Sequence, residues 1–297
     1  MEKYSQGKHF SALAALFLMG DAVICLPGNR SRQFVLIGAL LAVLLAVGET
    51  LAVTALINRL MRTGRQTMLK GVASISAALF AFWCGVRCFR QFVRFVSDIL
   101  LPKTGKVWIA VIFLTVLLFL LAKRSEVLLK LALMLFWVVV GVIVLIVVLS
   151  VKDFKIAHIA VYRLPTLKEL GEECLPFLPG IVFPALLIPP AQAVICGKPD
   201  CRGSLSGTFF GGALVLACFT DCLLLFGVKL SERLPYPLYS AVSTVTVGPL
   251  FTRMDGAVYG ILFVTALVKC TVSFKLSIAL LARLRREMSR RCKLAEM

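Results

Sequence analysis

The sequence has few of the residues on which most catalytic and metal sites depend. It contains two histidines, His9 and His158, and 15 acidic residues against 33 basic ones. Its ten cysteines include no C-x-x-C pair, and the chain has no H-E-x-x-H motif, no nucleophile elbow and no P-loop. We therefore expect no enzymatic activity, no catalytic residue, no cofactor and no metal site. The scattered cysteines are expected to be small apolar packing residues.

Long hydrophobic runs are what the sequence has instead. Hydrophobic residues make up 60% of the chain, and an apolar run of about 20 residues is enough to cross a bilayer as a helix. Such runs lie at residues 10–27, 34–57, 71–96, 107–122, 127–151, 173–196, 206–228 and 257–281. The sequence therefore predicts an all-α, polytopic membrane protein with eight transmembrane helices. The first of them is expected to stay in the protein as a transmembrane helix and not to be removed as a signal peptide.

The net charge of +18 raises the question of a nucleic-acid partner, which its distribution argues against. Six basic residues lie in residues 282–297, directly after the last apolar run. Basic residues in this position are typical of a tail at the cytoplasmic membrane surface. An even number of spans puts both termini on one side of the membrane, and the basic tail makes that side the cytoplasm. Because the tail accounts for this cluster of positive charge, we expect no nucleic-acid partner.

Residues 171–197 are apolar enough to enter the bilayer but contain five prolines, Pro176, Pro179, Pro184, Pro189 and Pro190. Each proline removes a backbone donor and crowds the preceding turn, so a continuous helix is excluded. The first span is also interrupted, at Pro27. Interrupted helices in corresponding positions of two halves favour a transporter-type ligand site lined by helix ends. The stretch at residues 231–256 is too polar for a ninth span and is expected to form a surface hairpin or partly re-entrant cap.

Four ionisable residues fall within the predicted spans: Asp21, Glu49, Asp221 and Lys269. A charge at mid-membrane costs on the order of 3 kcal/mol unless it meets a partner or a cavity. Lys269 shares one helix face with Thr265 and Ser273, at four-residue spacing. For each of them a purely structural role is the alternative to a role in ligand binding. Lys269 could neutralise a carboxylate on a neighbouring helix, and the acidic residues could hydrogen-bond locally. Arg87, Arg90 and Arg94 are expected to snorkel to the outer interface.

A series of different short motifs is spread over nearly the whole chain. They are Gly20 with Leu26 and Pro27, Arg90-Gln91-Phe92, Leu101-Pro102-Lys103-Thr104, Arg124-Ser125-Glu126, Phe183-Pro184, Tyr236-Pro237-Leu238, Gly248, Arg253-Met254-Asp255 and Val268-Lys269. In this order and spacing they resemble the membrane-embedded B subunits of spore-germination nutrient receptors, which belong to the amino acid-polyamine-organocation transporter superfamily.

The resemblance implies a five-plus-five inverted repeat with discontinuous helices one and six and a solute pocket between them. Residues 1–151 would form the first repeat, residues 152–281 a second repeat shortened to three helices, and residues 282–297 the cytoplasmic tail. It further implies sensing of a germinant such as an amino acid in the inner membrane of a bacterial spore. The implied partners are an A-type membrane subunit and a C-type lipoprotein.

Our hypothesis for the site is that a small zwitterionic solute binds between the two broken spans. Its carboxylate would meet exposed backbone donors at a half-helix N-terminus. The predicted ligand-binding residues are Gly20, Asp21, Ala22, Val23, Phe183, Pro184, Lys269 and Ser273. Two alternatives are an amino-acid permease and a shortened member of the family that binds no solute.

Overall fold

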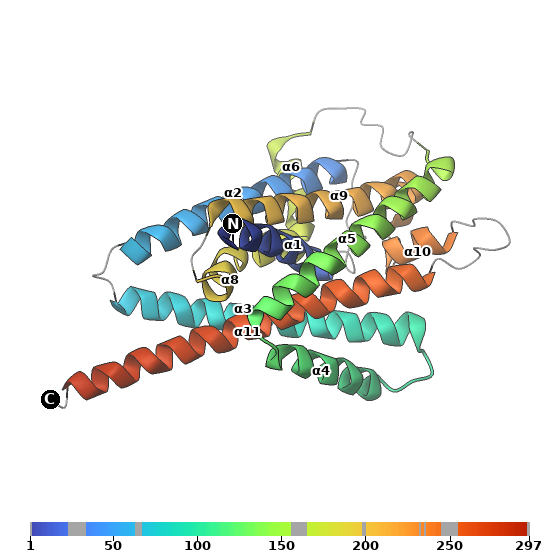
Figure 1. The fold of residues 1–297 in the computed structure, drawn as a ribbon. Coiled ribbons are helices and arrows are strands. Elements are labelled where there is room, and N and C mark those ends of the chain that lie inside the picture. The colour runs from blue at the N-terminus through green and yellow to red at the C-terminus, as the bar shows by residue number, and fades with distance from the viewer. Residues whose placement is uncertain are drawn as a thin grey trace.

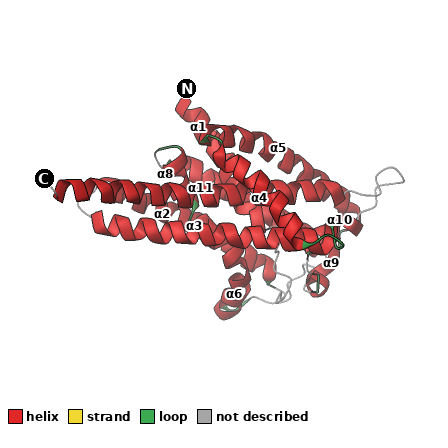
Figure 2. Cartoon of the chain, turned by 90° about the horizontal axis from the view of Figure 1, so that it is seen from below, coloured by secondary structure: helices red, strands yellow, loops and turns green. Residues whose placement is uncertain are grey.

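The computed structural model describes residues 2–22, 34–62, 67–155, 165–197, 200–231, 233–234, 236–244 and 255–295 of the 297-residue chain. The side chain of Asp21, the residue Val23 and the predicted break at Pro27 lie outside these described parts, as do residues 245–254. Within the described ranges every regular element is a helix (Figures 1 and 2).

The chain forms a bundle of long apolar helices, as the hydrophobic runs predict. Its main elements are α1 (Glu2–Ala22), α2 (Val35–Arg62), α3 (Thr67–Phe95), α4 (Lys106–Ala122), α5 (Ser125–Ser150), α9 (Cys201–Ser231), α10 (Pro237–Thr244) and α11 (Asp255–Ala295). Six described stretches are long and apolar enough to cross a membrane, and α4, with 17 residues, is shorter. This confirms a polytopic, all-helical integral membrane protein, while the count of eight spans and the inverted repeat stay predictions.

The helix α1 lies at the centre of the bundle, between α9, α5 and α11 (Figure 1). Every side chain from Ala12 to Met19 is at most 3% exposed. A helix that is apolar on all sides must be covered on all sides, whether by protein or by lipid. Here protein covers it, so the first hydrophobic run of the chain forms the core around which the later helices pack.

Glycines on α9 allow α1 to approach closely. A Cβ atom added to Gly207 would lie 2.7 Å from the carbonyl oxygen of Ser11, and one added to Gly211 would lie 2.8 Å from that of Ala15. Real Cβ atoms do not come this near to backbone oxygen. The small-x-x-x-small spacing therefore marks a tight helix contact, as it does in many membrane proteins.

The proline-rich segment is a distorted helix of several short pieces. It runs through α6 (Leu167–Cys174), the 3-10 turn η4 (Leu175–Phe177), the π-helical turn η5 (Leu178–Val182), α7 (Phe183–Ala185) and α8 (Ile188–Ile195). The predicted absence of a continuous α-helix is thus confirmed. The distortion consists of changes in helical winding, because the backbone keeps right-handed helical angles at the junctions.

Arg87 on α3 differs from the expectation that its side chain snorkels to the outer interface. Its guanidinium donates a hydrogen bond to the carbonyl oxygen of Pro179 at 3.3 Å and lies over the ring of Trp83. Arg90 and Arg94 are exposed, as expected for snorkelling side chains. Arg87 instead satisfies a carbonyl in the π-helical turn, where the changed winding disturbs the regular hydrogen-bond ladder. Spacing along α3 could not reveal this partner, since it lies 92 residues away.

The last span and the basic tail form one helix. We predicted a span at residues 257–281 followed by a separate tail, whereas α11 continues without interruption for 41 residues, from Asp255 to Ala295. Near the middle of this helix, the Lys275 ammonium donates a hydrogen bond at 2.5 Å to the carbonyl oxygen of Lys123, at the end of α4. Arginine and lysine are good helix formers, so the basic sequence extends the helix after the apolar sequence ends.

Candidate functional site

The lysine Lys269 is completely buried in α11. Thr265 and Ser273, one turn before and one turn after it, are also completely buried. The predicted polar face of this helix is therefore confirmed, and it faces into the protein. An ammonium group inside a membrane bundle is costly, which makes its surroundings the first place to look for a binding function.

Gly20 of α1 provides the space in which the Lys269 side chain lies. A Cβ atom on Gly20 would be 2.3 Å from Cδ of Lys269 and 2.7 Å from its Cβ. The Lys269 ammonium nitrogen lies 5.6 Å from the centroid of the Phe17 ring, within the range of a cation–π interaction. Two residues predicted to share the site are thus in direct contact, although 249 positions separate Gly20 from Lys269 in the sequence.

The end of α1 meets the proline-rich segment beside this pair. A Cβ atom on Gly180, in η5, would lie 3.5 Å from the Cα atom of Ala22. Pro184 is buried in the same segment. The structure therefore brings Gly20, Ala22 and Lys269 to the region where α1, η5 and α11 converge. Asp21 and Val23 belong to the predicted site, but the Asp21 side chain and all of Val23 lie outside the described residues.

Two of the predicted site residues face α3. Phe183 is 37% exposed, and its ring lies edge-on to that of Phe80 with centroids 6.4 Å apart. Ser273 packs beside Gly85, where an added Cβ would lie 3.2 Å from the serine Cβ. The Ser273 hydroxyl is buried and has no hydrogen-bond partner among the described residues. The predicted set is therefore split between the α1 side and the α3 side of α11.

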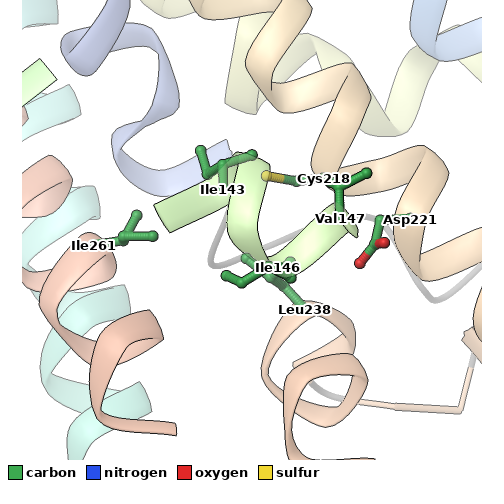
Figure 3. Close-up of a pocket in the computed structure, with 7 residues that line it drawn as sticks. All are labelled: Ile143, Ile146, Val147, Cys218, Asp221, Leu238 and Ile261. Atoms are coloured by element: carbon green, nitrogen blue, oxygen red, sulfur yellow. The ribbon is translucent and has the colours of Figure 1, made fainter. Parts of the chain in front are cut away.

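A small cavity lies next to Asp221 on α9 (Figure 3). Its volume is about 10 Å³, near the lower limit for one water molecule. Asp221 is 2% exposed, and neither carboxylate oxygen makes a hydrogen bond of ordinary geometry within the described parts of the chain, although the Ser150 hydroxyl lies close to the carboxylate. The other walls are Ile143, Ile146, Val147, Cys218, Leu238 and Ile261. Such walls offer no oxygen ligands for a hard cation.

Sequence reasoning missed a buried polar cluster at the turn between α8 and α9. The side-chain oxygen of Gln192 accepts hydrogen bonds from the Ser204 hydroxyl at 2.6 Å and from the backbone N–H of Asp200 at 2.9 Å. One turn further along α9, the hydroxyls of Thr208 and Thr50 lie 3.1 Å apart and join α9 to α2. The sequence signal for this cluster was Gln192 itself, a single amide in an apolar run, because a buried amide requires hydrogen-bond partners.

A larger cavity is an apolar groove between α2, α3, α8 and α11, with a volume of about 630 Å³. It is lined by residues such as Leu56, Ala77, Phe80, Leu186, Leu280 and Arg283. Neither this groove nor the cavity at Asp221 has Gly20, Lys269 or Ser273 in its walls. Periodicity could not predict the groove, because four segments distant in sequence form it.

Comparison of the chain with protein-family models, with curated proteins and with solved structures finds no match.

Proposed function

We propose that the chain is a transporter-like membrane subunit that binds a small solute where α1, η5 and α11 converge. The observation that carries this proposal is the completely buried Lys269, packed against Gly20 beside the proline-distorted segment. A cation at this depth is costly and is commonly retained for a binding or coupling role. Distorted helices beside it are where transporters place their substrates.

The proposed solute is a small zwitterion such as an amino acid. Its carboxylate complements the Lys269 ammonium, and a charge-assisted hydrogen bond between them would offset part of the cost of burying both charges. The Lys269 side chain fills the space beside Gly20. Binding therefore requires the lysine, or the end of α1, to move and open room for the solute.

The resemblance to germination-receptor B subunits specifies the proposal further. In that role the chain senses a nutrient in the inner membrane of a bacterial spore, together with an A-type membrane subunit and a C-type lipoprotein. As a permease, by contrast, it moves the solute alone. Co-purification with an A-type subunit and no uptake into liposomes would support the receptor, whereas coupled uptake by the chain alone would support the permease.

The binding test is a thermal-stability screen of the detergent-purified protein against amino acids. A ligand that binds only the folded state raises the unfolding midpoint in a concentration-dependent way. Lys269→Met is expected to abolish the shift for a solute that stabilises the unsubstituted protein. Lys275→Met is the matched control, because Lys275 lies on the same helix but bonds to the end of α4. An unchanged shift in Lys269→Met would contradict the proposed site.

A second candidate, a scaffold that binds no solute, is favoured by the close packing around Gly20 and Lys269. In that case Lys269 would serve the contact between α1 and α11 alone. This candidate predicts that no amino acid shifts the unfolding midpoint. It also predicts that Lys269→Met leaves assembly with partner subunits intact.

A further inference from the structure

The apolar groove of about 630 Å³ is separate from the proposed solute site. Its size falls within the roughly 300–1,000 Å³ of typical small-molecule sites. It lies between helices that are long and apolar enough to cross the bilayer, so hydrocarbon chains have access to it from the membrane. The groove therefore requires an occupant that is compatible with a lipid environment.

The walls of the groove are suited to a hydrocarbon chain. They are mainly aliphatic and aromatic, with Leu56 on α2, Phe80 on α3 and Leu186 just before α8. One of the hydroxyl groups in the wall, that of Ser76, donates a hydrogen bond to the carbonyl oxygen of Ala73 at 3.1 Å. This hydroxyl therefore needs no polar group from a ligand.

One end of the groove is basic. Arg283 on α11 is part of its wall and is exposed. Arg285 and Arg286, which follow after Leu284, are exposed too. The neighbouring Leu284 reaches the start of α3, where its Cδ2 lies 4.0 Å from the position of a Cβ on Gly71. Residues 282–297 carry six basic and two acidic residues, so positive charge predominates beyond this end.

An apolar groove with arginine at one end matches an amphipathic anion. Arginine binds phosphate through two parallel hydrogen bonds, and basic pockets between membrane helices bind anionic lipid headgroups. We propose that the groove binds an anionic phospholipid, with an acyl chain between α3 and α8 and the phosphate on Arg283. The charge complementarity at Arg283 distinguishes this lipid from a zwitterionic one.

The test counts lipids bound to the full-length protein. Delipidated protein in detergent is titrated with phosphatidylglycerol or phosphatidylcholine, and bound lipid is measured by native mass spectrometry. Phosphatidylglycerol is expected to bind more tightly, and Arg283→Gln to lower this preference about five-fold, as expected for the loss of one cation at an anionic headgroup. Ala77→Trp on α3 and Val53→Trp on α2 are each expected to block the site for both lipids.

Arg233→Gln is the matched control, because Arg233 is exposed and is not part of the groove wall, so its loss should change nothing. Equal binding of the two lipids would overturn the proposal, as would unchanged phosphatidylglycerol binding in both tryptophan variants. Competition by free glycerol phosphate would indicate a soluble phosphate ligand and would also overturn it. If the tryptophan variants lose a partner subunit but keep the lipid, the groove holds a protein helix instead.

Discussion

Gly20 and Lys269 share one small space in the core, and this makes the glycine intolerant of even one methyl group. Gly20→Ala would place Cβ 2.3 Å from the lysine Cδ, so we expect a loss of about 1–3 kcal/mol from overpacking. Gly48→Ala is the control, because nothing lies within 4 Å of a Cβ at that helical position. It should be neutral or stabilising by up to about 1 kcal/mol, since alanine is the better helix former. Thermal unfolding in detergent measures both.

A double-mutant cycle with Lys269→Ala tests whether the lysine is the cause. Truncating Lys269 removes its Cγ and Cδ, two of the three atoms that an alanine at position 20 would strike, and leaves only Cβ, 2.7 Å away. The two substitutions should therefore be non-additive, with Gly20→Ala costing clearly less in the Lys269→Ala background. Strictly additive losses would show that the lysine side chain beyond its Cβ does not restrict Gly20.

Asp221 makes no hydrogen bond of ordinary geometry within the described residues, and the nearby Ser150 hydroxyl donates instead to the carbonyl oxygen of Ile146. A buried group without partners costs about 1–3 kcal/mol, so Asp221→Leu is expected to raise stability by a similar amount. The adjacent cavity of about 10 Å³ provides room for the slightly larger side chain. Asp98→Leu is the comparison, because that carboxylate accepts hydrogen bonds from Ser97 and Tyr236 and should not be stabilised by its loss. A lower unfolding midpoint for Asp221→Leu would mean that Asp221 binds an ion or ligand that stabilises the fold.

At the scale of elements, the join between α8 and α9 depends on one amide. Gln192→Leu removes two hydrogen bonds and leaves the completely buried Ser204 hydroxyl without this acceptor, so we expect a loss of about 2–3 kcal/mol. Gln91→Leu is the matched control, because the Gln91 side-chain oxygen is buried without a partner among the described residues. Its replacement should cost little. Equal losses for the two variants would show that Gln192 contributes by packing alone.

At the scale of the whole molecule, the start of α9 and the end of α11 lie toward one end of the bundle, and the turn between α3 and α4 lies at the other (Figure 1). A membrane-impermeant thiol reagent applied to one side of sealed vesicles should therefore label Cys201 and Ser289→Cys together. It should label Lys103→Cys only from the opposite side. Labelling of Cys201 and Lys103→Cys from the same side would contradict a bundle that spans the membrane along this axis.

Cys196 provides an internal comparison in the same experiment. Burial, together with the negative charge of Asp200, raises the pKa of the Cys196 thiol above its ordinary value. Because the thiolate is the reactive form, Cys196 should be labelled more slowly than the exposed Cys201, and its rate should keep rising toward higher pH. Equal rates at neutral pH would contradict this environment.

The sequence by itself determined the features that depend on local composition. Apolar runs predicted the long helices, and the prolines excluded a regular helix at residues 171–197. The spacing of Thr265, Lys269 and Ser273 predicted their shared buried face. These features could be predicted because hydrophobicity and backbone restriction act on residues close together in the chain.

Only the tertiary structure decided which distant groups meet. Arg87 bonds to a carbonyl 92 residues away, and Thr50 to a hydroxyl 158 residues away. The contact of Gly20 with Lys269 joins the first and last described helices, and the walls of the apolar groove come from four separate segments. Membrane helices are all apolar to a similar degree, so hydropathy shows that they enter the bilayer but not which helix each one packs against. The partner is chosen by close packing and by hydrogen bonds between helices, and these exist only once the bundle has formed.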